Sequence, residues 1–129
     1  MTKIFISHAW KYDEHYWKVY NWIKEELDIA DYSIPEHDNC GDKLSDKKLK
    51  ECIDEQIRQS QIVIILSGMY VSYSDWIQYE IEKAYEMGKY IVGVKPWGNE
   101  KMPQIVQNKA NVTVGWNKNS IISAIKGLK

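Results

Sequence analysis

The sequence predicts an α/β fold of three layers, in which helices cover both faces of a central five-stranded parallel sheet. Short β-rich runs alternate five times with segments of helical spacing, which favours parallel strands joined by crossover helices. The run at residues 62–67 is apolar up to its last residue, Ser67, as is typical of a strand covered on both faces. With 129 residues and 44% apolar side chains, we expect one domain spanning residues 1–129.

The first part of the chain predicts two strands, one helix and a long loop. Residues 3–7 form a short β-rich run, and residues 12–30 carry apolar side chains at helical spacing. A second, weaker strand is expected at residues 32–34, where Pro35 ends it. After Pro35, the Asp, Asn and Gly content of residues 36–45 predicts a loop.

A second helix is expected to begin at Ser45 or Asp46, both of which are suitable N-caps. Its spacing gives one apolar face that carries Leu49, Cys52, Ile53 and Ile57. The apolar strand at residues 62–67 follows, and a loop at residues 68–73 leads into the next helix.

The third helix is expected to begin with Asp75 as its N-cap, because Gln78 three residues later can complete a capping box. Gly88 is expected to end it, since glycine is the usual residue just past a helix. Its expected inner face carries Ile77, Ile81, Ala84 and Tyr85. The remaining strands and helices are expected at residues 90–94, 102–108, 112–114 and 120–128.

This arrangement predicts a flavodoxin-like sheet with the strand order 2-1-3-4-5. In such folds the ligand binds at the carboxyl edge of the sheet, where the strand order reverses between the first and third strands. Residues 7–10 and residues 67–80 would therefore border one crevice, and the loop at residues 35–45 is expected to close over it.

The composition argues against binding to polyanions and against membrane insertion. The formal net charge is -1, and no run of like charge marks a surface for nucleic acid or anionic lipid. No apolar stretch approaches the roughly 20 residues that a membrane helix needs, and the start of the chain lacks a signal sequence, so we expect a cytoplasmic protein. Cys40 and Cys52 lack the spacing of a metal or redox motif and are expected to be reduced.

Several activities that use this fold need residues that the chain lacks. A phosphoacceptor receiver needs carboxylates where this sequence has Ser7, His8, Ser67 and Gly68. A flavodoxin needs a small, hydroxyl-rich phosphate loop after the first strand, where residues 8–11 are bulky. No G-x-G-x-x-G, G-x-x-x-x-G-K-[ST] or G-x-S-x-G motif is present, which excludes Rossmann dehydrogenases, P-loop NTPases and α/β-hydrolases.

Three segments in order resemble one known family. They are Phe-Ile-Ser-His-Ala at residues 5–9, Ile-Leu-Ser at residues 65–67 and Asp-Trp-Ile-Gln-Tyr-Glu-Ile at residues 75–81; residues 88–94 resemble the same family's fourth strand. Over nearly its whole length the chain resembles the Toll/interleukin-1 receptor (TIR) domains. More narrowly, it resembles the bacterial TIR-like proteins of the Thoeris anti-phage systems.

The resemblance implies an activity and a catalytic residue. Enzymatic TIR domains cleave the nicotinamide–ribose bond of NAD, and their essential glutamate lies in a W-x-x-x-E pattern that Trp76 and Glu80 match. NAD is then the substrate, with no separate cofactor. In Thoeris-like systems the ADP-ribosyl product is cyclised or conjugated into a signal that activates a separate effector. The resemblance also implies self-association into TIR oligomers on activation.

The chemistry of this cleavage suits a single carboxylate. Nicotinamide leaves a cationic pyridinium as a neutral ring, so it needs no general acid, unlike the leaving group of an ordinary glycosidase. An ionised Glu80 could accept hydrogen bonds from the ribose hydroxyls and stabilise the oxocarbenium-like transition state. Its place near a helix N-terminus is expected to keep it ionised. The acceptor that replaces nicotinamide stays open among water, an adenine nitrogen, a ribose hydroxyl and another molecule.

The residues expected around the substrate come from the ends of two strands, from the third helix and from the 35–45 loop. They are Ser7, His8, Ala9, Trp10, Ser67, Trp76, His37, Asp38 and Lys43, with no metal site among them. His8 is expected either to hydrogen-bond a ribose or phosphate or to be structural. Trp10 stands where some animal TIR enzymes carry basic residues, which argues against a phosphate clamp there; stacking on adenine or nicotinamide is the alternative. The 35–45 loop, called the BB loop in TIR domains, contacts either the ligand or a neighbouring subunit.

Three hypotheses from different classes remain open. The first is an NAD-consuming enzyme, of NAD glycohydrolase or ADP-ribosyl cyclase type, that makes a nucleotide signal in anti-phage defence. The second is a non-catalytic TIR-like adaptor that acts through self-association, in which Glu80 is only a charged surface residue. The third is a nucleotide sensor that uses the same crevice without turnover.

Overall fold

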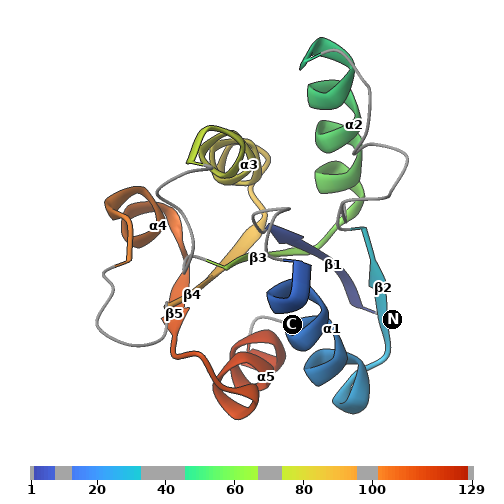
Figure 1. Ribbon diagram of the computed structural model, residues 1–129, viewed down its shortest axis with the longest axis vertical. Helices are drawn as coiled ribbons and strands as arrows, with labels where there is room; N and C mark the ends of the chain where they lie inside the picture. The colour runs from blue at the N-terminus through green and yellow to red at the C-terminus, as the bar shows by residue number, and fades with distance from the viewer. Residues whose placement is uncertain (1, 8–12, 33–45, 67–73, 96–101, 128–129) are drawn as a thin grey trace.

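The computed structural model describes residues 2–7, 13–32, 46–66, 74–95 and 102–127, and at residues 13, 46 and 74–77 it describes the backbone alone. Within these ranges strands and helices alternate along the chain (Figure 1). The elements are β1 (Thr2–Ser7), α1 (Asp13–Glu26), β2 (Ile29–Asp31), α2 (Asp46–Gln59), β3 (Ile62–Leu66), α3 (Ser74–Glu86), β4 (Tyr90–Val94), α4 (Gln104–Lys109), β5 (Val112–Val114) and α5 (Lys118–Gly127).

The five strands form one parallel sheet in the order β2-β1-β3-β4-β5, which confirms the predicted fold class and strand order. Because all strands run in the same direction, their carboxyl ends lie at one edge. The pairing of Ser7 with Ile65 fixes the register of β1 against β3. The last residue of β1 therefore lies beside the end of the most apolar strand, at the predicted switch point.

Helices cover both faces of the sheet: α1 and α5 lie on one side, and α2, α3 and α4 on the other (Figure 1). Each side has its own apolar core. The α1/α5 core contains Ile4, Ile6, Val19, Ile23, Ile64, Val92 and Ile121. The α2/α3/α4 core contains Phe5, Ile53, Ile57, Val63, Ile65, Ile81, Ala84, Ile91 and Val106. The described helices include none that is long and apolar enough to cross a membrane.

The two cores divide the side chains of β1 by the alternation of a strand. Ile4 and Ile6 belong to the α1/α5 core, while Phe5 belongs to the α2/α3/α4 core. Ser7 is two residues beyond Phe5, so its side chain points to the same face as Phe5. The end of β1 thus presents a hydroxyl to the layer that contains α3.

The position of the second strand was predicted wrongly. The sequence favours a helix to residue 30 and a strand at 32–34, but α1 ends at Glu26 and β2 is Ile29–Asp31. Leu27 and Ala30 continue the helical spacing from Ile23, which explains the error. The backbone instead pairs with β1, where the Thr2 N–H donates to the Asp28 carbonyl at 2.9 Å. Long-range pairing therefore overrides the local pattern.

The third helix differs from prediction at its start and agrees at its end. It begins at Ser74, which places Asp75 inside the first turn and not at the N-cap. Gln78 donates to Glu82, four residues on, at 3.3 Å. At the other end Gly88 has φ +70°, and the Lys89 N–H donates to the Ala84 carbonyl, so the helix ends in a Schellman motif as expected.

Two further expectations for single side chains were wrong. Tyr85 was expected on the inner face of α3, but its side chain is 57% exposed. The expectation that both cysteines are reduced also fails, because Cys52 on α2 is disulfide-bonded. The other predicted inner residues of α2 are buried, as expected.

Candidate active site

The end of β1 and the second turn of α3 bring two polar side chains together inside the protein. The Ser7 hydroxyl donates a hydrogen bond of 2.6 Å to Oε1 of Glu80. Ser7 is 1% exposed and Glu80 is 5% exposed. Two polar groups this deeply buried have little access to bulk water, so this hydrogen bond supplies each with a partner inside the protein.

Glu80 occupies a position on α3 where an apolar side chain would be expected. It lies beside Ile81 and one turn before Ala84, and both of these are fully buried against the sheet. Ser7 reaches the same face from β1, because strand alternation directs it toward the α3 layer. The fold therefore places a carboxyl group at the carboxyl edge of the sheet, where α/β proteins bind ligands.

Burial controls the protonation of this carboxyl group. Loss of water raises the pKa of Glu80 from 4.5 to about 8, and the hydrogen bond from Ser7 acts in the opposite direction. The expectation that the helix N-terminus keeps Glu80 ionised is therefore wrong for the protein without ligand. A carboxyl group with a raised pKa at the ligand-binding edge of the sheet is a candidate functional group.

The other predicted site residues contribute no described side chain. His8, Ala9, Trp10, His37, Asp38, Lys43 and Ser67 lie outside the described residues. Trp76 lies on α3 one turn before Glu80, but its side chain also lies outside the description. The structure thus brings together Ser7 and Glu80 of the predicted set. In the described ranges no three His, Cys, Asp or Glu side chains gather closely enough to hold a metal ion.

A contact between α3 and α2 lies next to Glu80 and was not expected from the sequence. Tyr79, next to Glu80, donates a hydrogen bond to Asp54 on α2. The ammonium groups of Lys50 and Lys83 lie 5.4 and 6.0 Å from the centre of its ring. Burial and the Asp54 carboxylate raise the pKa of Tyr79, so the phenol remains a donor. The sequence does place a tyrosine next to an inward-facing position of the helix, which could have indicated such a contact. Its partner on α2 could not be identified from the sequence.

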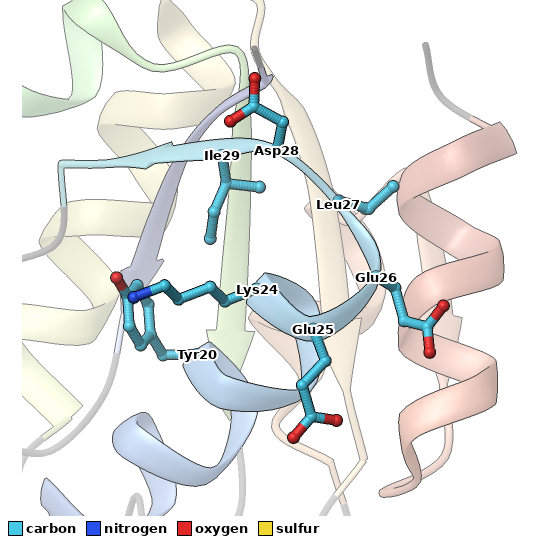
Figure 2. Close-up of a pocket in the computed structure, with 7 residues that line it drawn as sticks. All are labelled: Tyr20, Lys24, Glu25, Glu26, Leu27, Asp28 and Ile29. Atoms are coloured by element: carbon cyan, nitrogen blue, oxygen red, sulfur yellow. The ribbon is translucent and has the colours of Figure 1, made fainter.

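One described depression lies away from these residues. It has a volume of about 430 Å³ and is lined by Tyr20, Lys24, Glu25, Glu26, Leu27, Asp28 and Ile29 (Figure 2). These residues end α1 and begin β2, so the depression lies at the amino edge of the sheet. Glu25 and Glu26 pair with Lys118, and Lys24 lies over the Tyr20 ring. The acidic groups of this depression are thus largely neutralised within the protein. The depression is not part of the Ser7–Glu80 site.

Comparison with solved structures supports the fold. A conserved protein from Enterococcus faecalis V583 is similar with 15% identity, a TM-score of 0.71 and coverage of 98% of both chains. The Clostridium botulinum CMP N-glycosidase BcmB is similar with 15% identity and a TM-score of 0.64, covering 97% of this chain and 98% of BcmB. A putative pilus assembly protein from Burkholderia thailandensis E264 has 10% identity and a TM-score of 0.62, covering 99% and 98%. A search of curated proteins finds no similar sequence.

Fold and site together define an α/β protein of the TIR-like class, with a buried glutamate on the helix after the third strand. The model of one family matches residues 5–101, which is more than half of the chain. The chain belongs to that family, the TIR-like domain of the Thoeris protein ThsB.

Proposed function

We propose that this protein cleaves the nicotinamide–ribose bond of NAD and makes a cyclic nucleotide signal, derived from ADP-ribose, that activates a separate effector in anti-phage defence. The buried carboxyl group of Glu80, bound by the Ser7 hydroxyl at the ligand-binding edge of the sheet, carries the proposal. We place the reaction in the cytoplasm and expect the protein to self-associate on activation.

Glu80 has the chemistry that this reaction needs. When the bond between ribose C1′ and the nicotinamide nitrogen breaks, both electrons go to the nitrogen and the pyridinium becomes a neutral ring. Positive charge develops on the ribose, and an ionised Glu80 would stabilise it most strongly in a site shielded from water. The acceptor then forms a new bond to C1′ and releases its proton.

The raised pKa of Glu80 fits a cationic substrate. Without ligand, a pKa of about 8 leaves most of the carboxyl protonated at pH 7. The positive nicotinamide ring would favour the ionised form on binding, since an opposite charge within about 4–6 Å lowers the pKa of an acid. A neutral analogue of the ring would lack this effect. The site would thus select the charged, reactive form of the substrate.

Two comparisons support the reaction class. The matched family is named for a Thoeris TIR-like domain, and the signalling role through a separate effector follows from that membership. One similar structure is named a CMP N-glycosidase, an enzyme that breaks a base–sugar bond on the same fold. The bond between nicotinamide and ribose is also an N-glycosidic bond.

The test measures nicotinamide released from NAD by the purified protein and by its Glu80→Gln variant. We expect release by the wild type and a loss of about a hundredfold or more in the variant, because the amide cannot carry the negative charge. Glu82→Gln is the matched control, since it makes the same change on the exposed face of the same helix. Equal turnover by Glu80→Gln and wild type would remove Glu80 from the mechanism.

Mass spectrometry of nucleotides from phage-challenged cells identifies the product. It also detects activity if the enzyme works only after infection. A new ADP-ribosyl species in wild-type cells, absent with Glu80→Gln, supports the proposal. The alternative is a non-catalytic adaptor, and it is favoured by three large aromatic side chains among the described residues that remain 46 to 57% exposed, Trp17, Tyr85 and Tyr90. Self-association without any new ADP-ribosyl species would support the adaptor.

A further inference from the structure

We propose that Ser7 is a positioning residue, which holds the carboxyl group of Glu80 in place and keeps it available in its ionised form. This inference rests on the proposed function for its effect on catalysis. It departs from the expectation that Ser7 contacts substrate, because the hydroxyl is directed at Glu80 and acts through it.

The Ser7–Glu80 contact is a short hydrogen bond. Its distance of 2.6 Å lies at the lower end of the range for O–H···O bonds, where bonds to a carboxylate fall, so the contact would strengthen when Glu80 ionises. The donor is on the sheet and the acceptor on a helix, so two packed elements fix their separation. A side chain held in this way keeps one rotamer, which a reacting carboxylate needs.

Among the described residues, no charged side chain of a neighbouring element pairs with this carboxyl group. On α2, Lys50 and Asp54 are directed at Tyr79, and on α4, Lys109 lies 4.1 Å from the centre of the Tyr85 ring. Among the described residues, the buried side chains that β1, β3 and β4 present to this face are apolar apart from Ser7, and include Phe5, Val63, Ile65 and Ile91. Lys3, at the other end of β1, is exposed.

The charged side chains that the structure describes on α3, which leave out Asp75, are also engaged elsewhere. Glu82 accepts a hydrogen bond from Gln78, and Lys83 pairs with Glu86 at 3.6 Å. Among the described residues, burial and the Ser7 hydroxyl are the two influences on the pKa of Glu80, and only Ser7 lowers it. Removal of the Ser7 hydroxyl would therefore leave burial unopposed.

The direct test is a pH titration of Glu80 by NMR, with ¹³C at the glutamate side-chain carboxyl groups. Glu80→Gln assigns the resonance, because it removes that signal alone. We expect a wild-type midpoint well above that of free glutamate, and in Ser7→Ala a midpoint higher by about one pH unit. Ser7→Thr keeps a hydroxyl and should return the midpoint toward the wild-type value.

Ser60→Ala is the matched control. Ser60 is 2% exposed, and its hydroxyl donates to the Ile57 carbonyl at 2.7 Å. This serine lies before β3, at the opposite edge of the sheet from Glu80. Its loss also removes one buried hydrogen bond, yet it should leave the Glu80 midpoint unchanged. A purely structural role for Ser7 predicts that the two alanine variants behave alike.

A kinetic measurement connects the contact to catalysis. In Ser7→Ala the acid limb of kcat/KM for NAD should move to higher pH by the same amount as the NMR midpoint, with about a tenfold loss on that limb. If Ser7→Ala does not fold, Ser7→Cys replaces it, since a thiol is a weaker donor and should shift the midpoint in the same direction.

The outcomes separate this inference from the proposed function. An unchanged or lowered midpoint in Ser7→Ala, or an equal shift in Ser60→Ala, would overturn the role of Ser7. A raised midpoint in a protein that never cleaves NAD would support the control of Glu80 by Ser7 and contradict the proposed function.

Discussion

Ser7 and Glu80 are 73 positions apart in the sequence, yet a 2.6 Å hydrogen bond joins their side chains beneath the surface. The contact exists because β1 and α3 end and begin at the same edge of the parallel sheet. Keeping a carboxyl group there costs stability, since burial disfavours its charged form. Such a cost is common where function requires a group that packing alone would not select.

Glu80→Gln should therefore make the protein more stable at neutral and alkaline pH. Between pH 4.5 and 8 the folded protein binds more protons at Glu80 than the unfolded chain, so the free energy of unfolding falls as the pH rises. The shift in pKa corresponds to roughly 3 to 5 kcal/mol over this window. Urea denaturation of wild type and variant at pH 5 and pH 8 checks this, with a larger difference expected at pH 8.

Glu82→Gln controls for the general loss of one negative charge from α3. Glu82 is exposed, so its replacement should change stability by less than about 0.5 kcal/mol at either pH. If Glu80→Gln has the same stability as the wild type at both pH values, Glu80 is solvated in solution and the carboxyl group is not buried as described.

The pH dependence of NAD cleavage should show the same carboxyl group. Because the ionised form is the proposed active form, kcat/KM should rise with pH up to a pKa of about 8 and then level off. The rise of kcat with pH should occur at lower pH than the rise of kcat/KM, because the bound cationic substrate favours the carboxylate form of Glu80. Initial rates of nicotinamide release from pH 5.5 to 9.5 check this; a kcat/KM that already levels off near pH 5 would contradict it.

The sequence predicted the features that repeat along the chain and missed those set by distant contacts. The alternation of five β-rich runs with helical segments predicted the parallel sheet, and the apolar run of β3 predicted a strand covered on both faces. The position of β2 was wrong, since Leu27 and Ala30 fit a helix and only pairing with β1 decides between the two. The error came from a local rule applied where a long-range contact decides.

The candidate site shows the same division. Glu80 could be selected from its place after the third strand and from its resemblance to a family pattern. The protonation state of Glu80 could not be predicted from the sequence. The nearby helix N-terminus, which favours the ionised form, can be recognised in the sequence, but burial of the carboxyl group depends on how α3 packs on the sheet. The contact with Ser7 likewise depends on the register of β1 and on the direction of both side chains.

Tyr79→Phe should weaken the attachment of α3 to α2 without changing the titration of Glu80. The variant loses the hydrogen bond to Asp54 but keeps the ring between Lys50 and Lys83. We expect a loss of about 1 kcal/mol in the free energy of unfolding. Urea denaturation and the Glu80 NMR titration measure the two effects separately. A shifted midpoint would show that Tyr79 positions Glu80 as well.

Gly93→Ala should destabilise the packing of α4 on the sheet. A Cβ atom at Gly93 would lie 2.8 Å from Cγ1 of Val106, a fully buried side chain of α4, and 3.5 Å from Cβ of Ala110. Contacts this close force the helix or the strand to shift, which costs about 1 to 3 kcal/mol in a packed core. Thermal unfolding should show a lower Tm.

Gly127→Ala is the matched control, because nothing lies within 4 Å of its Cβ position near the end of α5. That variant should keep the wild-type Tm or exceed it slightly, since alanine favours the helix. Equal Tm values for Gly93→Ala and Gly127→Ala would mean that α4 does not approach β4 as closely as described.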